Sequence, residues 1–388
     1  MDRGTLREDV HPMEFGIFNA ACLLPKYRDL HGDAAEHNRI MDEVAFIVAA
    51  DKAGFKYTWA SEHHFLTDYS HMSASESFLA FVAAKTSNIH IGSGIFNITP
   101  PVNHPARIAE RVAMLDHLSE GRFEFGTGRG SSTTEQRGFG IEDPDLTREM
   151  VAEVLPQLVR MWKEEEYSFD GKFFSMPTRN VLPKPYSLPH PAIWMAAGSP
   201  STFDLAAELG VGILCFGFST PDQLTPLVAR YKEKIADCKD PVGAYVNNNV
   251  MITTQMICME DGAKARQTFL ESESNYHLSL VFRYLDTFPK PPGLPVWPEL
   301  VPAMDAATLD AVIASGDIAV GTPDEVTKAI ENYGRTGADQ IAFGMLSTSM
   351  SREHCEEAVE TFGRHVLHNF DKDPVHSTTR QRQAQGGK

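Results

Sequence analysis

Short apolar runs alternate with amphipathic helical patterns along most of the chain, and this alternation limits the possible folds more than any other feature. The runs that predict strands are residues 13–18, 56–60, 89–96, 122–127, 192–196, 211–216, 249–259 and 340–345. Helical patterns separate them, as over residues 35–52, where apolar side chains share one face. Eight strands alternating with helices favour a (β/α)8 TIM barrel over an open sheet. We therefore expect a single α/β barrel domain over residues 1–370.

Three segments depart from this alternation. Residues 167–191 are rich in proline and predict an excursion that contains a hairpin. Residues 278–302 hold the run FPKPPGLPVWPEL and look like a Pro-rich insertion in the C-terminal half. Its Phe288, Leu294 and Trp297 fit a lid or pocket wall, and they fit equally a rigid surface excursion or a dimer contact. Residues 371–388 are polar and predict a flexible tail.

Charge and cysteine content narrow the class of function. A formal net charge of −17 over 388 residues argues against nucleic acid or an anionic membrane as the main partner, because both favour a basic patch. Five cysteines without a C-x-x-C pair indicate reduced thiols rather than disulfides or a zinc site. The sequence has no signal-peptide pattern and no apolar run long enough to span a membrane. These features predict a soluble cytoplasmic enzyme.

The unusual stretches of the sequence all follow predicted strands. They are Glu62-His63-His64 after the second strand, residues 97–103 after the third, GTGRG at 126–130 after the fourth, and GSPST at 198–202 after the fifth. In a TIM barrel the loops after the strands meet at one rim, which carries the reactive groups. We therefore expect these stretches to lie close together.

The GSPST turn and the GTGRG run together indicate a phosphate site. The turn opens a helix, so it offers backbone N–H groups and three hydroxyls at the positive end of the helix dipole. Taken alone it fits an ordinary serine helix cap as well. Arg129 lies between Gly128 and Gly130, which permit close approach of a ligand, and a guanidinium binds two phosphate oxygens at once. The run lacks the spacing of a dinucleotide fingerprint or a P-loop.

The histidine pair predicts one functional and one structural side chain. His63 and His64 are adjacent on an extended segment, so they point to opposite sides and only one faces the pocket. The other is expected to make a structural hydrogen bond, and Glu62 to be a buried carboxylate that bridges strands. No H-E-x-x-H motif or nearby cysteine supports a metal site. His104, before Pro105, fits either a helix-entry residue or a neighbour of the ligand.

Several runs, taken in order, resemble one protein family. They are MEFGIF, WASEHHF, NHPARIAERVAMLDHLSEGRFEFGTGRG, WMAAGSPSTFDLAAELG and VGTPDEVTKAIENYGRTGADQIAFG. They are similar to the bacterial luciferase-like flavin-dependent monooxygenases, most of all to the luciferase α-subunit type. The resemblance extends from about residue 13 to 365 and is weaker over about 231–302.

The resemblance implies a barrel that binds reduced FMN, which reacts with O2 to give a C4a-peroxyflavin that oxygenates a small organic substrate. His63 matches the family's active-site histidine beside the flavin, which implies acid–base work. Gly94-Ile95 aligns with a non-prolyl cis peptide under the isoalloxazine ring. The cofactor-binding set that the resemblance implies is Gly94, Ile95, Gly128, Arg129, Ala197, Gly198, Ser199, Ser201 and Thr202, with no metal.

Two positions depart from the luciferase pattern. Gly128 stands where luciferase has a reactive cysteine, and Gly198 stands where it has a glutamate. We therefore expect hydroxylation or a Baeyer–Villiger type oxygenation rather than light emission. The chain shows no Rossmann fingerprint, so reduced flavin is expected from a separate reductase. The family also implies a homodimer or a dimer of related subunits. A deazaflavin-dependent hydride-transfer oxidoreductase on the same barrel and a non-catalytic flavin-binding protein remain as alternatives.

Overall fold

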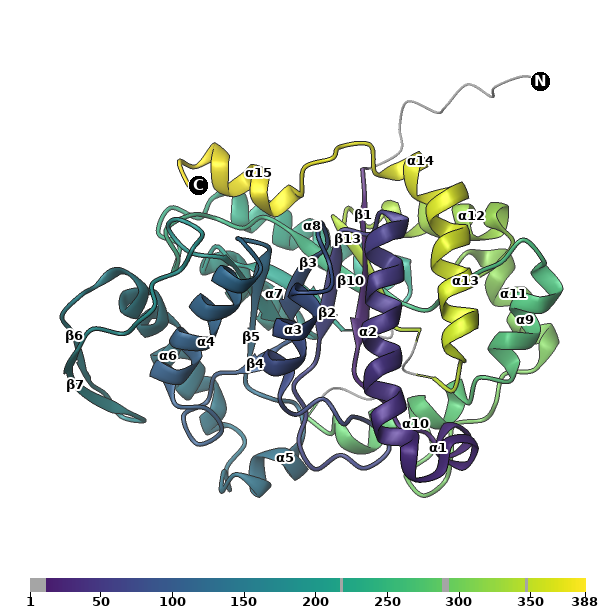
Figure 1. The fold of residues 1–388 in the computed structure, drawn as a ribbon, viewed down its shortest axis with the longest axis horizontal. Helices are drawn as coiled ribbons and strands as arrows, with labels where there is room; N and C mark the ends of the chain where they lie inside the picture. The colour runs from purple at the N-terminus through teal and green to yellow at the C-terminus, as the bar shows by residue number, and fades with distance from the viewer. Residues whose placement is uncertain (1–11, 217–218, 288–292, 346–347) are drawn as a thin grey trace.

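Eight parallel strands form a closed barrel in the computed structural model, which describes residues 12–216, 219–287, 293–345 and 348–388 (Figure 1). The strands are β1 (Glu14–Asn19), β2 (Tyr57–Ala60), β3 (His90–Ser93), β5 (Phe123–Gly128), β8 (Ala192–Ala196), β9 (Gly212–Cys215), β10 (Val250–Thr254) and β13 (Gln340–Phe343). They pair in the order β3-β2-β1-β13-β10-β9-β8-β5, and pairing of β3 with β5 closes the ring. The prediction of a (β/α)8 barrel is confirmed.

Helices surround the barrel and connect its strands (Figure 1). They are α2 (Ala35–Ala53), α3 (Ser75–Ala83), α4 (Pro105–Leu118), α6 (Leu146–Lys163), α7 (Pro200–Glu208), α8 (Pro221–Ala236), α12 (Pro323–Gly334) and α13 (Arg352–Phe362). Capping boxes begin α8, through Thr220 and Gln223, and α12, through Thr322 and Glu325. Each box satisfies backbone donors that a helix start leaves unpaired, which fixes where the loop ends and the helix begins.

The structure contains further strands and helices besides those of the barrel. Two short strands, β6 (Tyr167–Asp170) and β7 (Ser175–Arg179), form the expected hairpin. The predicted strand 89–96 is divided into β3 and β4 (Phe96–Asn97), and the Gly94–Ile95 peptide bond between them is cis, as expected. The predicted strand 249–259 becomes β10 followed by β11 (Met256–Cys258), and β11 pairs with β12 (Ala319–Gly321) outside the barrel. The remaining helices on the rim side are α1 (Pro25–His31), α5 (Thr133–Gly138) and α11 (Ala306–Ser315).

The helical pattern over about residues 262–276 predicts a single helix, and this prediction is wrong. The structure has α9 (Gly262–Leu270) and α10 (Ser274–Tyr284), separated at Glu273, whose φ of 54° is left-handed. A left-handed residue cannot continue a right-handed helix, so the chain changes direction there. The Pro-rich insertion consequently begins after Tyr284 rather than at Leu278.

The barrel interior is filled by large side chains. Tyr57, Trp59, Trp194, Leu214 and Met251 form a cluster that is completely buried. A Cβ built on Gly92 would lie 2.3 Å from Cε3 of Trp59, so only glycine lets β3 pass this indole. The base and middle of the barrel are therefore packed solid, and space for a ligand is confined to the opposite end.

The prediction of a flexible tail from Asp371 is wrong. The segment forms α15 (Ser377–Ala384), which lies across the end of the barrel opposite α5 and α10 (Figure 1). Ser377 and Thr378 are buried there, and they donate hydrogen bonds to Glu14 and Glu124 at the starts of β1 and β5. The segment is polar because its partners are buried carboxylates, and composition alone cannot distinguish such a segment from a solvated one.

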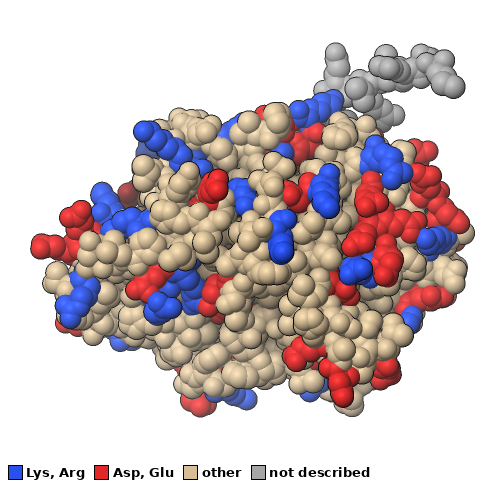
Figure 2. Space-filling view, in the orientation of Figure 1, with Lys and Arg blue, Asp and Glu red and all other residues tan. Residues whose placement is uncertain are grey.

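Both signs of charge occur on the molecular surface, with acidic side chains gathered over α13 on the face shown in Figure 2. Within the described ranges, no helix is long and apolar enough to cross a membrane.

Candidate active site

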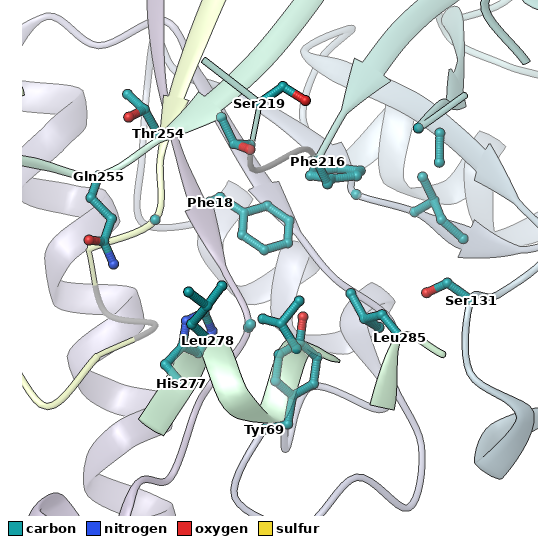
Figure 3. A pocket seen from close by; sticks show the side chains of 18 of the residues that line it. Phe18, Tyr69, Ser131, Phe216, Ser219, Thr254, Gln255, His277, Leu278 and Leu285 are labelled. Atoms are coloured by element: carbon teal, nitrogen blue, oxygen red, sulfur yellow. The ribbon is translucent and has the colours of Figure 1, made fainter. Parts of the chain in front are cut away.

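A cavity of about 960 Å³ opens at the rim formed by the carboxyl ends of the strands (Figure 3). It brings together loops that are distant in sequence. The predicted residues that line it are Glu62, His63, Gly94, Ile95, Gly128, Arg129, Gly130, Gly198, Ser199, Ser201 and Thr202. Ala197 is the exception among the expected cofactor-binding residues, because it belongs to the hydrophobic core and is 3% exposed. It follows a strand end, where neighbouring residues point to opposite sides.

Two arginines give one part of the cavity a positive charge that suits an anion. Arg129 and Arg148 both line it, and Nη1 of Arg129 donates to Oγ1 of Thr147 at 3.0 Å. Burial, and then the nearby positive charge of Arg148, lower the pKa of Arg129. Asp145 opposes this shift only in part. Two guanidinium groups held in this way gain stability when an anion binds between or beside them.

The 198–202 turn adds neutral donors to this part of the cavity. Ser199 is the N-cap of α7, and its Oγ accepts from the backbone N–H of Thr202 at 3.4 Å. The same Oγ lies 3.1 Å from Oγ of Ser201 and 2.9 Å from Oγ1 of Thr202. The turn is therefore a helix cap that also lines the cavity, so the two readings of the sequence are compatible. Its hydroxyls stand together at the positive end of α7.

Gly128 packs closely against Ile95, which follows the cis peptide bond. A Cβ built on Gly128 would lie 2.7 Å from Cδ1 of Ile95. Any side chain at position 128, including the cysteine of luciferase, therefore requires Ile95 to move. Glycine at position 128 thus leaves room for the Ile95 side chain, which forms this part of the cavity wall.

His63 lies on the cavity wall and is held by a carboxylate from α5. Its Nδ1 is 3.2 Å from Oε1 of Glu135, and the backbone N–H of His64 donates to the same oxygen at 2.7 Å. A carboxylate at Nδ1 favours the tautomer with its proton there, which places the ring's lone pair on Nε2. His63 is thus fixed in orientation and can accept or return a proton at Nε2.

His64 points away from the cavity. Its Nε2 is 3.4 Å from Oε1 of Glu62, and its ring packs edge-on against Phe139 at 4.9 Å between centroids. Glu62 is buried, and the same oxygen accepts from Nδ2 of Asn103 at 2.8 Å. His104 caps α4, where its Nδ1 accepts from the N–H of Ala106. The structure thus assigns structural roles to His64 and His104.

The Pro-rich insertion contributes to the cavity wall. Thr287, Val301 and Pro302 line the cavity, while Trp297 packs against Tyr276 of α10 with ring centroids 6.0 Å apart. Phe288 lies outside the described residues. Leu294 is not among the described residues that line the cavity.

Four cavity or near-cavity residues were not predicted from the sequence. Glu135 is 72 positions from His63, Arg148 is the third residue of α6, and Tyr69 and His277 line the cavity from the loop after β2 and from α10. The rim position of the 61–74 loop after β2 could be predicted, but not which of its side chains turns inward. His277 has no motif around it that distinguishes it from a core histidine. Among the described residues, no group of three or more His, Cys, Asp or Glu side chains could hold a metal ion.

Comparison with known proteins agrees with this geometry. Residues 13–340 match the family described as luciferase-like monooxygenase. The chain is 24% identical to the oxygenase component of the flavin-dependent trigonelline monooxygenase of Acinetobacter baylyi, over 88% of this chain and 93% of that protein.

Two solved structures share the fold. The oxygenating constituent of 3,6-diketocamphane monooxygenase from Pseudomonas putida, a type II Baeyer–Villiger enzyme solved with FMN, has a TM-score of 0.73 at 20% identity and covers 92% of this chain and 98% of that one. The coenzyme F420-dependent tetrahydromethanopterin reductase of Methanopyrus kandleri has a TM-score of 0.64 at 21% identity, over 93% of this chain and all of that one.

The family match covers most of the barrel and includes the loops that carry His63, Arg129 and Ser199. The chain belongs to the luciferase-like monooxygenase family.

Proposed function

We propose that the protein is the oxygenase component of a two-component flavin-dependent monooxygenase. It binds reduced FMN delivered by a separate reductase and uses O2 to hydroxylate a small organic substrate or to insert oxygen in a Baeyer–Villiger reaction. The observation that carries the proposal is that one cavity combines a cationic, hydroxyl-rich part at Arg129, Arg148 and Ser199 with a wall that is mainly apolar, although Glu62 and Asp317 also line it.

The residues of the cationic part fit the phosphate of FMN. A phosphate carries nearly two negative charges, which compensate the repulsion between Arg129 and Arg148. The hydroxyls of Ser199, Ser201 and Thr202 can donate to its remaining oxygens. The isoalloxazine ring would then lie toward Gly94, Ile95 and the interior of the cavity. When bound, the reduced flavin supplies the electrons that activate O2.

The chain's own contributions to the chemistry are a proton carrier and a dry surface. His63 holds a proton on Nδ1 against Glu135 and can transfer one at Nε2. Phe18, Phe216 and Leu285 surround the cavity with hydrocarbon (Figure 3). Such a surface keeps water away from the activated oxygen, which would otherwise be released as hydrogen peroxide before it reacts with the substrate.

The relatives support this choice of cofactor and partner. The trigonelline enzyme is described as an oxygenase component, which implies a second protein that provides reduced flavin. The diketocamphane enzyme holds FMN on the same fold. By the same family reasoning we propose that this chain forms a homodimer or pairs with a related subunit, and sedimentation as a monomer would contradict that part of the proposal.

A deazaflavin-dependent hydride transferase is the second candidate, because the F420-dependent reductase shares the fold. A hydride transferase does not require O2. Anaerobic turnover with reduced F420, together with weak binding of FMN, would favour this candidate. Tight binding of oxidised FMN without oxygen-dependent chemistry would instead favour a non-catalytic flavin-binding protein.

Stopped-flow absorbance tests the proposal most simply. The protein is mixed anaerobically with reduced FMN and then with oxygenated buffer. We expect an oxygen-dependent transient that outlives the reaction of O2 with reduced FMN alone, because the cavity shields the flavin from water. Reoxidation at the rate of unbound reduced FMN would contradict the proposal.

A further inference from the structure

Three aromatic rings in contact with one another form part of the cavity wall. Tyr69 lies in the middle, with its ring edge-on to His63 at 5.3 Å and nearly parallel to His277 at 5.7 Å. His277 comes from α10, while the other two residues follow β2. Figure 3 shows the hydroxyl of Tyr69 and the imidazole of His277 in the cavity, beside Leu278 and below Phe18. Neither Tyr69 nor His277 has a part in the proposed flavin chemistry.

The Tyr69 hydroxyl and the His277 imidazole both face the cavity. Within the described parts of the chain, no hydrogen bond joins Oη of Tyr69 or a ring nitrogen of His277 to another group. Tyr69 is nonetheless 7% exposed. Neither the Tyr69 hydroxyl nor the His277 ring nitrogens are among the polar atoms of the described residues that the protein encloses without a partner, so both groups are open to the cavity and are satisfied there by water or by a ligand.

Both groups are neutral at ordinary pH. Burial, followed by the nearby Cys22 and then the negative charge of Glu135, raises the pKa of Tyr69. Burial alone lowers the pKa of His277 to about 4. Burial is the only cause of the shift at His277, so the charge of Glu135 acts on the Tyr69 side of this wall and not at His277. The wall offers a phenol O–H donor and an uncharged imidazole with one donor and one acceptor.

The position of Tyr69 is fixed before any ligand arrives. Its carbonyl accepts from Sγ of Cys22 at 2.8 Å, and its N–H donates to the carbonyl of Leu66. Oη of Tyr276, the residue before His277, donates to Asp68 at 2.9 Å, which ties α10 to the loop that carries Tyr69. A preorganised donor loses little entropy when it binds a ligand.

The surroundings are hydrocarbon. Leu278, Val281 and Leu285 of α10 and its following loop, and Phe18 of β1, line the same part of the cavity. An anionic ligand placed here would lose its hydration without gaining a counter-charge and would lie near the negative charge of Glu135, which is strongly unfavourable. An apolar ligand with one uncharged oxygen would satisfy the unpaired groups and bury its remaining surface.

We propose that Tyr69 and His277 form the polar end of the organic-substrate site and select an uncharged, mainly apolar molecule with an oxygen that accepts a hydrogen bond from the Tyr69 phenol. The inference rests on the proposed function, because it takes this cavity to be the place where the organic substrate meets the flavin. Tyr69 and His277 are then specificity-determining residues that set which part of the substrate faces His63.

Equilibrium binding of three probes of one shape tests the inference. The probes are 2-naphthol, naphthalene and 2-naphthoate, titrated by calorimetry into the full-length protein without flavin, in a buffer that contains inorganic phosphate to occupy the arginine part of the cavity. We expect 2-naphthol to bind about tenfold tighter than naphthalene, as one hydrogen bond to a buried partner predicts, and 2-naphthoate to bind more weakly than either. Tyr69→Phe should abolish the preference for 2-naphthol and leave the affinity for naphthalene unchanged. His277→Phe, which keeps the stacked ring, should weaken 2-naphthol selectively.

Tyr284→Phe is the matched control. Tyr284 packs against Tyr69 with ring centroids 6.2 Å apart but is not among the residues that line the cavity, so this variant should keep the preference of the unmodified protein. A preference that survives Tyr69→Phe, or 2-naphthoate binding as tightly as 2-naphthol, would overturn the inference, as would no binding of 2-naphthol. Titration of the same variants with FMN separates the two proposals. Normal FMN binding with no selection among probes refutes the inference alone, whereas failure to bind FMN refutes the proposed function.

Discussion

The two ends of the barrel treat their polar groups in opposite ways. At the base, Nζ of Lys56 alone has four oxygen partners: Glu14 at 2.8 Å, Asp371 at 2.9 Å, and the carbonyls of Asp373 at 2.7 Å and Val375 at 3.2 Å. At the rim, by contrast, some side chains of the cavity have polar atoms without a hydrogen-bond partner among the described residues, such as the Tyr69 hydroxyl and the ring nitrogens of His277.

The base is also closed by a second cluster around Glu124. This carboxylate lies 2.7 Å from Nδ1 of His90 and accepts from Trp194 at 2.8 Å and from Thr378 at 2.6 Å. The rings of His90 and His376 stack at 3.6 Å. The contrast shows which polar groups are paired within the protein and which can bind a ligand. The base uses its polar groups within the protein for stability, and the rim keeps them for ligands.

Removal of residues 371–388 should have the largest effect, and it should fall on stability. The deletion leaves Lys56 and Glu124 buried without several of their partners, which we expect to lower the free energy of unfolding by about 4 kcal/mol. Urea unfolding followed by circular dichroism measures this. Lys372→Ala, an exposed change within the same segment, is the control and should have no effect. Equal stability of the full-length and shortened chains would remove the distinction between base and rim.

His63→Ala should have the next largest effect, and it should fall on chemistry. Loss of the proton carrier should shorten the oxygen-dependent transient of the bound flavin about 100-fold while FMN affinity stays the same. His64→Ala is the matched control, and it should lower the melting temperature but retain the transient, because its ring faces Glu62 and Phe139. Stopped-flow traces of His63→Ala that match those of the unmodified protein would contradict the role given to His63.

Arg129→Ala should weaken binding of reduced FMN by about 2 kcal/mol, the typical contribution of a hydrogen bond between charged groups. Anaerobic titration measures this change. Arg160→Ala, which removes an exposed arginine paired with Glu164 on α6, should leave the affinity unaltered. If both variants bind FMN as the unmodified protein does, the phosphate does not lie at Arg129.

The smallest effect is on how the stability contributed by the base of the barrel depends on pH. Burial lowers the pKa of His376 to about 2 and that of His90 well below its usual value. Both gain protons in the unfolded chain below about pH 6.5, so the stability they contribute is present above that pH and decreases as the pH falls. Glu124 acts in the opposite sense, because burial raises its pKa to about 7, and its contribution decreases as the pH rises toward 7.

The His376→Asn variant removes the contribution of one of the two histidines to this pH dependence. Lys56, Glu14 and Arg382, which act on the histidine pair, are present in both proteins. The slope of unfolding free energy against pH between 5 and 6 should therefore be smaller in the variant by about 1 kcal/mol per pH unit. Urea unfolding at each pH gives the two slopes. Parallel curves would show that His376 is protonated equally in the folded and unfolded chains.

The sequence was sufficient for the barrel because its eight strands, and most of the helices between them, follow from local periodicity and from capping residues such as Thr220 and Thr322. It also located the rim loops, since every strand end points to the same side. The resemblance to a known family added the cis peptide bond at Gly94–Ile95. These features depend on neighbours in sequence or on a pattern repeated around the barrel.

What the sequence could not provide depends on long-range pairing. Glu135 reaches His63 from 72 positions away, and α15 is buried although its composition is that of a solvated tail. His277 reaches the cavity because the chain turns at Glu273, and no turn motif in the sequence predicts the left-handed conformation of that residue. In each case the partner group decides the outcome, and it lies in another part of the chain.

Side-by-side anaerobic titration with reduced FMN and reduced riboflavin tests the central claim most directly, because the two flavins differ only in the phosphate. If the cavity holds the phosphate at Arg129, Arg148 and the Ser199 turn, FMN should bind at least about 30-fold tighter, as about 2 kcal/mol of charge-assisted hydrogen bonding predicts. Equal affinity for the two flavins would show that the cationic part of the rim does not recognise the cofactor.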